Sequence, residues 1–310
     1  MLDATSRAVF HFLANVHALQ RLASRYGMRE GGFARRFIAG EDIDEAVEAV
    51  RGLEARGLLL TLDYLGESVK TTAEADAATT DYRRIIQTIV QSGIERNVSL
   101  KLTQLGLDVD RATCIDNLRR ILDPAREHGF FVRIDMENSP YTDVTLQVFE
   151  TLWQQDYRNI GLVFQSYLMR TPNDIARINA LGARIRLVKG AYKERKTVAF
   201  QQKQDVDAAF VRLMQLLLDE GTYPAIATHD PKMLEATTEY AAHKSYARDR
   251  FEFQMLYGIR RDLQAQLTNE GFRVRVYVPF GREWFPYFMR RLGERPANIG
   301  FVMRRILSER

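Results

Sequence analysis

Residues 98–137 contain one complete unit of the pattern that decides the fold. The apolar run VSLKLTQLG (98–106) precedes the amphipathic stretch TCIDNLRRILDPAREHG (113–129), which ends in glycine, and a second apolar run follows, FFVRIDME (130–137). Apolar runs rich in β-branched and aromatic residues are typical of buried strands, whereas apolar residues at helical spacing predict a helix that ends near the glycine. The stretch therefore predicts a strand, a helix and a second strand, which is the unit of a parallel sheet.

Eight runs of this kind recur, and consecutive runs begin about 25–40 residues apart, the length of one strand-helix unit. They are LLLTLDYLG (58–66), VSLKLTQLG (98–106), FFVRIDME (130–137), IGLVFQSY (160–167), ARIRLVKGAY (183–192), YPAIATHD (223–230), FEFQMLYG (251–258) and RVRVYVPFG (273–281). Eight units in series predict an α/β fold, a closed (β/α)8 barrel of the TIM type. A doubly wound sheet would instead carry a glycine-rich loop after an early strand, and the sequence contains no G-x-G-x-x-G.

The barrel is expected to occupy residues 58–310, with a last helix over its mouth. Residues 1–57 precede the first run, and their pattern predicts helices with a break near GMREGG (27–32). They are therefore expected to form an N-terminal helical arm or cap. The stretch AVFHFLANVHALQRL (8–22) is interrupted by polar residues, so we do not expect a signal peptide.

Composition narrows the classes of function. The chain has 44 basic and 40 acidic residues, a net charge of +4 that is too small and too evenly spread for a nucleic-acid surface. The single cysteine, Cys114, cannot form an intrachain disulfide and fits a reducing compartment, where we expect it to fill space in a helix. No apolar run approaches the length of a membrane span and no Cys/His cluster predicts a metal site. We expect a cytoplasmic protein, with peripheral contact at the inner membrane face left open.

Polar side chains close every predicted strand, and in barrels of this type the chemistry lies at the carboxyl ends of the strands. Each residue alone has a structural explanation, such as a helix cap or a salt bridge. Together they form a ring that could bind an anion and tune a redox centre. The ring comprises Asp63, Glu67, Lys101, Gln104, Asp135, Glu137, Gln165, Arg186, Lys189, Tyr192, Thr228, His229, Asp230, Gln254, Tyr257 and Tyr277.

Alternation along two strands indicates which of these groups point inward. If Arg186 faces the barrel interior, it is a buried cation that requires an anionic partner or an electron-rich ring. Lys101 shares a face with Ser99 and Thr103, and Asp135, at the end of the next strand, is its expected partner. Asp230 precedes a proline and is explained as a helix cap, which leaves Thr228 and His229 to face a ligand.

The segment REWFPYFMRRLGER (282–295) predicts a helix with two arginines on one face. At helical spacing, Tyr287, Arg290, Arg291 and Glu294 fall within an arc of about 100°, with four apolar residues opposite. A solvated polar face is one explanation. Two arginines beside a tyrosine also suit the binding of a carboxylate or phosphate, and Glu67 could pair with one of them in the empty site.

Seven motifs, in order along most of the chain, resemble those of the proline dehydrogenase family. They are VSLKLTQLG, VRIDMENSPY, IGLVFQSYLMRT, RLVKGAY, ATHD, FEFQMLYG and YVPFGREWFPYFMRRLGERPAN. The chain is too short for the bifunctional form with a fused aldehyde dehydrogenase, so it resembles the monofunctional bacterial enzyme. The resemblance implies a (β/α)8 barrel that holds FAD, oxidises L-proline to Δ1-pyrroline-5-carboxylate as the first step of proline catabolism, and passes electrons to a membrane quinone.

The resemblance also implies a role for each matching residue. Asp135 and Arg186 would be the catalytic pair, and Glu67 the gate partner of an arginine. The carboxylate of proline would be held by Lys101, Arg290 and Arg291, and its ring walled by Tyr277, Tyr287 and Leu256. FAD would contact Met136, Gln165, Arg186, Val188, Lys189, Gly190, Ala191, Tyr192, Thr228 and His229.

Two other functions fit the ring of polar residues when it is considered alone. Barrels with lysines at strand ends can form Schiff bases, so an aldolase using Lys101 or Lys189 is one alternative. A barrel that binds an anion without catalysis is the other. The match of the seven motifs favours the oxidoreductase. The chemistry of proline agrees with it, because three cations can fix its one carboxylate and aromatic residues can cover its apolar ring. The sequence leaves open whether the protein forms a homo-oligomer.

Overall fold

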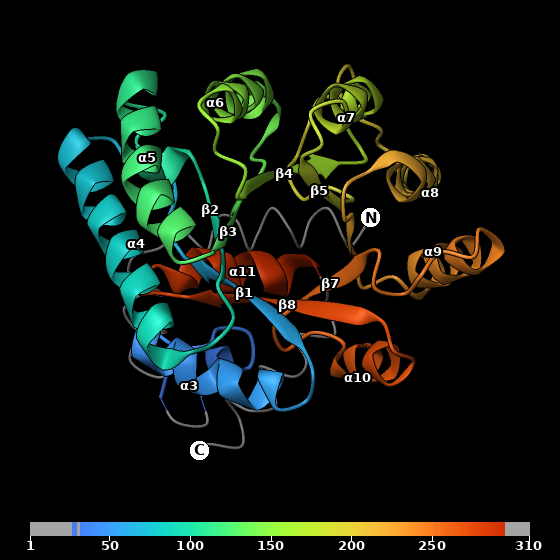
Figure 1. Ribbon diagram of the computed structural model, residues 1–310, viewed down its shortest axis with the longest axis horizontal. Coiled ribbons are helices and arrows are strands. Elements are labelled where there is room, and N and C mark those ends of the chain that lie inside the picture. The colour runs from blue at the N-terminus through green and yellow to red at the C-terminus, as the bar shows by residue number, and fades with distance from the viewer. Residues whose placement is uncertain (1–26, 30–31, 295–310) are drawn as a thin grey trace.

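Eight parallel strands close into a barrel in the computed structural model, which describes residues 27–29 and 32–294 (Figure 1). Each strand pairs with the next along the chain, and the eighth pairs with the first. The predicted TIM-type barrel is therefore confirmed. Each predicted run contains a strand, although the second strand begins at Asn97, one residue before its run. The strands are β1 Leu59–Tyr64, β2 Asn97–Leu100, β3 Phe131–Ile134, β4 Ile160–Gln165, β5 Arg184–Val188, β6 Ala225–Ala227, β7 Glu252–Leu256 and β8 Arg273–Phe280.

Helices alternate with the strands and surround them (Figure 1). The longest described helix is capped at both ends: the side chain of Thr71 and that of Glu74 each accept a backbone N–H of the other residue, and Gly93 ends the helix in the left-handed conformation. Asp230 caps the helix that starts at Pro231, which confirms its structural explanation. The helices are α3 Ile43–Glu54, α4 Thr72–Ser92, α5 Arg111–Glu127, α6 Thr142–Gln154, α7 Thr171–Asn179, α8 Lys203–Glu220, α9 Pro231–His243, α10 Arg261–Asn269 and α11 Trp284–Glu294.

The main core lies between the strands and the inner faces of the surrounding helices. It includes Cys114, fully buried in α5, where its thiol donates to the carbonyl of Leu102, as expected of a space-filling residue. It also includes the apolar face of α3, which lies within the predicted N-terminal arm. Residues 1–26 of that arm lie outside the described residues, and the boundary at residue 57 stays a prediction.

A second apolar cluster covers the carboxyl ends of β1, β7 and β8. We call it the cap cluster, and α11 contributes more residues to it than any other element. Because Leu65 follows β1 and Ile259 follows β7, α11 packs over the mouth of the barrel, as the sequence predicts. The cap cluster comprises Met28, Ala34, Phe37, Ile38, Leu65, Ile259, Trp284, Phe285, Tyr287, Phe288 and Met289.

Strand β2 is shorter than its apolar run suggests. It ends at Leu100, and the chain then turns through a 3-10 helix, Thr103–Leu105, that Gly106 closes with a positive φ of 94°. Alternation places Thr103 on the same strand face as Ser99 and Lys101, but Thr103 lies beyond the end of the strand. Its hydroxyl instead donates to the carboxylate of Glu137 at 2.7 Å.

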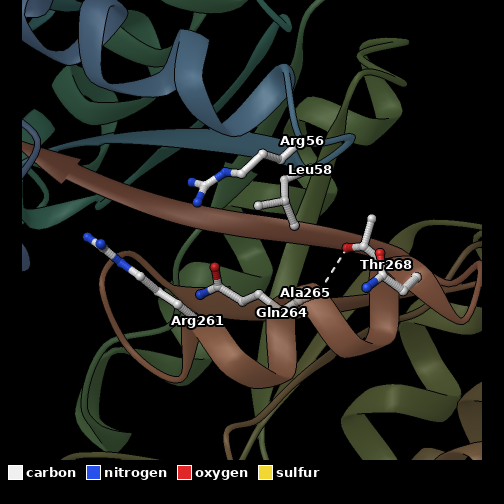
Figure 2. Close-up of a pocket in the computed structure, with 7 residues that line it drawn as sticks. Arg56, Leu58, Arg261, Gln264, Ala265 and Thr268 are labelled. Atoms are coloured by element: carbon white, nitrogen blue, oxygen red, sulfur yellow. Dashed lines mark hydrogen bonds between the residues drawn. The ribbon is translucent and has the colours of Figure 1, made fainter.

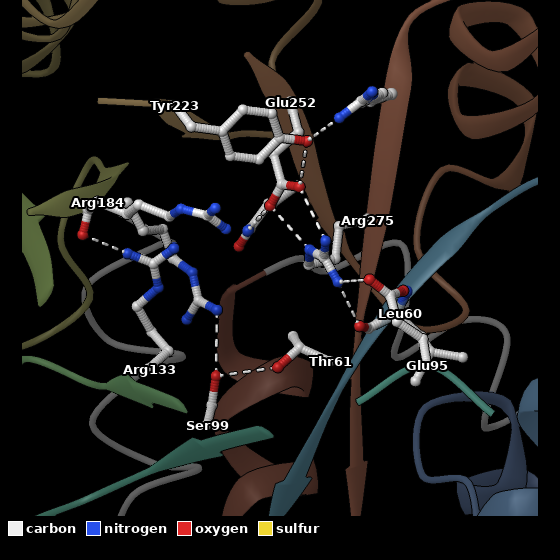
Figure 3. A network of polar contacts seen from close by, with 12 residues as sticks. Leu60, Thr61, Glu95, Ser99, Arg133, Arg184, Tyr223, Glu252 and Arg275 are labelled. Atoms are coloured by element: carbon white, nitrogen blue, oxygen red, sulfur yellow. Dashed lines mark hydrogen bonds and ion pairs between the residues drawn. The ribbon is translucent and has the colours of Figure 1, made fainter. Parts of the chain in front are cut away.

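A buried ion network fills the opposite, amino-terminal end of the barrel (Figure 3). The guanidinium of Arg275 on β8 donates to both oxygens of Glu252 on β7, at 2.8 and 3.0 Å, and to Glu95 at 2.6 Å. Burial alone would raise the pKa of Glu252, but Arg275 outweighs it and holds this pKa below its ordinary value. The network neutralises charges that would otherwise be costly to bury. Among the described residues, no helix is both long and apolar enough to span a bilayer.

Candidate active site

Arg186 occupies the centre of the site at the carboxyl end of the barrel. It lies in the middle of β5 and is only 4% exposed. Its Nη1 donates to Asp135 Oδ1 at 2.8 Å, and its Nη2 donates to Ser99 Oγ at 3.1 Å. The guanidinium also lies over the ring of Tyr277, 5.2 Å from the ring centroid. The inward orientation is confirmed, and Arg186 has both an anionic partner and an electron-rich ring.

Asp135 joins three strands at this point. It directly follows β3, pairs with Arg186 on β5 and accepts a hydrogen bond at 2.7 Å from the hydroxyl of Tyr277 on β8. Burial raises the pKa of Tyr277 well above its ordinary value, and the carboxylates of Asp135 and Asp63 raise it further. Tyr277 therefore keeps its proton and acts as a fixed donor to Asp135.

The ion pair of Lys101 corrects one expectation. Its Nζ lies 3.4 Å from Asp63 Oδ1 on β1, not beside the expected Asp135. The reason is the strand register: Asp63 pairs with Ser99, two residues before Lys101, while both oxygens of Asp135 are engaged by other groups. Sequence reasoning placed Asp63 at a strand end but gave it no partner. The register was the missing information.

Burial and the neighbouring charges shift the pKa of both members of this pair. Burial alone would lower the pKa of Lys101, but the carboxylates of Asp63 and Asp135 outweigh it and hold this pKa well above its ordinary value. Burial raises the pKa of Asp63, and the charge of Asp135 raises it further. The charge of Lys101 lowers this pKa but offsets the rise only in part. Lys101 is therefore a permanent cation and a poor amine nucleophile, which argues against Schiff-base chemistry.

Two of the predicted cofactor residues meet at the ends of β3 and β4. The side-chain amide of Gln165 donates to the carbonyls of Met136 and Glu137, both at 3.3 Å. Gln165 is 3% exposed, and its Oε1 has no hydrogen-bond partner among the described residues. A buried carbonyl oxygen of this kind is suited to accept a bond from a ligand.

The chain after β5 turns sharply at Gly190. Its φ of 112° favours glycine, and a Cβ at this position would lie 2.3 Å from the ring of Tyr167. The carbonyls of Val188 and Lys189 accept hydrogen bonds from the backbone that follows β4. Beyond the turn, Ala191 and Tyr192 lie at least partly exposed. The predicted cofactor segment 188–192 therefore has a tightly fixed start.

Lys189 lies between two carboxylates. Its Nζ donates to Asp207 at 2.5 Å and to Asp230 at 2.7 Å. Both contacts hold the side-chain nitrogen between two carboxylates, away from the position an imine-forming amine would need. They also link the end of β5 to the start of α9.

Thr228 and His229 are held by their neighbours at the end of β6. The hydroxyl of Thr228 accepts from the backbone N–H of Asp230 at 3.1 Å. His229 Nε2 accepts from the backbone N–H of Leu256, the last residue of β7, at 2.8 Å, so this nitrogen carries no proton. Leu256 packs against the cap cluster, so His229 joins the predicted cofactor residues to the predicted wall of the substrate site.

Among the side chains of α11 that the structure describes, Tyr287 differs from the expected two-sided pattern. It does not lie on a solvated polar face but is 8% exposed and part of the cap cluster. The guanidinium of Arg291 lies over its ring, 5.2 Å from the centroid. The side chain of Arg290 lies outside the described residues. The pair between Glu67 and an arginine stays a prediction.

A cavity of about 310 Å³ lies elsewhere, on the outside of the barrel (Figure 2). It runs along α10 toward the segment that enters β1. Arg56, Arg261 and Gln264 line it, together with apolar atoms. None of the strand-end residues described above contributes to this groove, so it is not the predicted active site.

Comparison with known proteins decides the family. A family model for proline dehydrogenase matches residues 46–304. The chain belongs to the proline dehydrogenase family. Proline dehydrogenase 1 of Bacillus subtilis subsp. natto is 43% identical over 303 residues, covering 98% of this chain and 99% of the relative. The proline dehydrogenase of Deinococcus radiodurans is 40% identical over 312 residues, covering 99% and 100%.

A solved structure agrees with this assignment to the proline dehydrogenase family. The crystal structure of proline utilization A (PutA) from Bdellovibrio bacteriovorus, inactivated by N-propargylglycine, is similar with a TM-score of 0.78 at 28% identity. The match covers 84% of this chain and 32% of the PutA chain, so the chain spans about a third of that protein. The resemblance drawn from the seven motifs is confirmed, and the chain is an oxidoreductase. The aldolase and the non-catalytic alternatives are wrong.

Proposed function

We propose that this enzyme oxidises L-proline to Δ1-pyrroline-5-carboxylate with FAD as its cofactor and a membrane quinone as the final electron acceptor. Membership of the family supports proline oxidation, the first step of proline catabolism. The observation that carries the finer proposal is the buried group of Arg186, Asp135 and Tyr277, which lies beside the Lys101 cation at the carboxyl end of the barrel.

The residues at this end fit FAD. The Nε of Arg186 and the Oε1 of Gln165 are buried and have no hydrogen-bond partner among the described residues, which suits them to a polar ring system. When bound, FAD supplies an acceptor for the two electrons of the hydride that leaves C5 of proline for the flavin N5. The residues that would hold it are Met136, Gln165, Arg186, Val188, Lys189, Gly190, Ala191, Tyr192, Thr228 and His229.

Arg186 would act through its charge. A cation held rigidly in a buried site stabilises negative charge that develops during a reaction, because it need not reorient. The ion pair with Asp135 and the bond to Ser99 fix the guanidinium in place. Asp135 is fixed in turn by Tyr277. The protein's own contribution is thus to position the substrate and to stabilise charge, while the cofactor carries the redox chemistry.

The substrate would be held by its carboxylate. Lys101 remains charged in the site, and its ammonium has three donors, so it can contact both Asp63 and a substrate oxygen. Arg290 and Arg291 would complete the grip from α11. Tyr277, Tyr287 and Leu256 would cover the apolar ring, and Glu67 would close the gate by pairing with an arginine. The product forms when C5 loses a hydride and the ring nitrogen loses a proton.

The function is tested by turnover of the FAD-loaded enzyme with a soluble quinone. We expect L-proline to be consumed and Δ1-pyrroline-5-carboxylate to be trapped as its adduct with o-aminobenzaldehyde. Adding lipid vesicles that carry a long-chain quinone tests the electron acceptor and the proposed peripheral contact with the membrane. Release of a different product from L-proline, or no turnover with any quinone, would contradict the proposal.

A further inference from the structure

Asp63 is a buried carboxylate in the site to which the proposed mechanism gives no role. It is the fifth residue of β1 and is 1% exposed. One oxygen lies 3.4 Å from Lys101 Nζ, and the other has no hydrogen-bond partner among the described residues. Burying a carboxylate this fully is costly, so its presence calls for an explanation.

The surroundings of Lys101 show what Asp63 could do. The second nearby carboxylate, Asp135, has one oxygen bonded to Arg186 and the other bonded to Tyr277. Tyr192, Glu67 and Glu137 also interact electrostatically with Lys101, and the effects of Tyr192 and Glu67 on its pKa are smaller than those of the two aspartates. Asp63 is thus a carboxylate in ionic contact with this ammonium, at 3.4 Å, and the side chain of Lys101 is itself buried.

We propose that Asp63 is a positioning residue whose carboxylate keeps Lys101 protonated, so that the site binds a carboxylate substrate even at alkaline pH. This inference rests on the proposed function, in which Lys101 holds the carboxylate of proline. An ammonium buried without a counter-ion loses its proton readily, whereas one paired with a carboxylate retains it.

The balance of effects on Lys101 supports this role. Burial is the largest effect and acts to lower the pKa of Lys101, and Asp63 is the largest effect that opposes it. Without the charge of Asp63, burial is opposed mainly by Asp135, whose oxygens are bonded elsewhere. The pKa of Lys101 should then fall toward the range in which the enzyme is assayed.

The test measures binding of a carboxylate that cannot be oxidised as proline is. Tetrahydrofuran-2-carboxylate keeps the ring and the carboxylate but has no amine, so it does not titrate at alkaline pH. Its affinity for the FAD-loaded enzyme is measured by calorimetry from about pH 7 to about pH 10, near the ordinary pKa of lysine. The variants are Asp63→Asn, Asp63→Glu, Lys101→Met, and the double variant Asp63→Asn with Lys101→Met.

We expect the affinity of the wild type and of Asp63→Glu to stay constant across this range. The affinity of Asp63→Asn should fall about tenfold per pH unit above the lowered pKa of Lys101, because binding then requires uptake of one proton. It should level off at the value of Lys101→Met. The double variant should show no such fall, since the titrating ammonium is gone, and this controls for every other group that titrates.

Several outcomes would overturn the proposal. A flat profile for Asp63→Asn, or a loss of affinity equal at every pH, would show that Asp63 acts only through packing. If Asp63→Asn does not fold, the pH profile of the wild type alone decides. A wild-type affinity for the analogue that falls as the pH rises, with an apparent pKa at or below that of ordinary lysine, contradicts the proposed role of Asp63. If Lys101→Met binds the analogue as tightly as the wild type, Lys101 does not hold the substrate carboxylate. The proposed function is tested independently, by reduction of the flavin with L-proline.

Discussion

Replacing Arg186 with methionine tests the centre of the site. The change keeps an apolar stem of similar length but removes the guanidinium that bonds Asp135 at 2.8 Å and Ser99 at 3.1 Å. Removing one preorganised donor for developing charge costs about 2.7–4 kcal/mol in known enzymes. We therefore expect the limiting rate of flavin reduction by L-proline to fall about 10²- to 10³-fold.

The same substitution should affect binding much less. In the proposed arrangement Arg186 does not hold the proline carboxylate, so the affinity for tetrahydrofuran-2-carboxylate should change by less than about tenfold, or 1.4 kcal/mol. Some stability should also be lost, because breaking a buried ion pair costs about 3–5 kcal/mol. The loss should lie at or below the lower end of that range, since Asp135 keeps its bond from Tyr277 and its side chain is 14% exposed.

Anaerobic stopped-flow spectroscopy of the flavin separates the two effects. Arg184→Met is a matched control: Arg184 lies two residues earlier on β5, is exposed and stacks on Phe131 and Tyr223, not on the site. The control should reduce its flavin at nearly the wild-type rate. The reasoning fails if Arg186→Met keeps the wild-type limiting rate and only the dissociation constant of proline rises, because Arg186 would then be a substrate ligand.

Three further predictions follow from single residues. Arg291→Met should weaken binding of the carboxylate analogue by about 10- to 150-fold, because one charge-assisted hydrogen bond is lost, while the visible spectrum shows full flavin content. Loss of flavin with normal analogue binding would show that Arg291 binds the cofactor instead. Gly190→Ala should cost about 1–3 kcal/mol from its φ of 112° plus the clash with Tyr167, and lower the flavin content; unchanged melting and flavin content would contradict this. Glu252→Gln should lower the free energy of unfolding in urea by about 3 kcal/mol, because Arg275 loses a buried charged partner. The pKa of Glu252 is lowered in the folded protein, so the carboxylate stabilises the fold above about pH 4.3, the ordinary pKa of glutamate. This stabilisation is lost as the pH falls through the folded-state pKa, where the stabilities of the variant and the wild type should converge.

The barrel could be predicted because its signal is local and repeated. Each of the eight apolar runs contains strand residues, and several helices begin at a side-chain cap, as at Thr71 and Asp230. The end of β2 could not be predicted in the same way. Its apolar residues continue to Leu105, but the turn closed by Gly106 ends the strand at Leu100.

The structure brings several of the predicted site residues together, but not in all of the expected pairs. Alternation along β5 left two orientations for Arg186, and the structure shows the inward one, with Arg186 buried beside Asp135. The partner of Lys101 depends on the register between β1 and β2, which no local pattern encodes, so Asp63 was missed as its counter-ion. Tyr287 was placed on the polar face, since helical spacing alone does not reveal which neighbours the cap cluster provides.

The central claim is that this barrel binds FAD and reduces it with L-proline. The direct measurement is the visible spectrum of the purified, FAD-loaded protein before and after anaerobic addition of L-proline, with D-proline as the control. We predict a yellow protein whose flavin absorbance is lost with L-proline and retained with D-proline, because in the proposed arrangement one fixed carboxylate grip would face one fixed flavin. A folded protein that cannot be loaded with FAD, or a bound flavin that L-proline leaves oxidised, would contradict the claim.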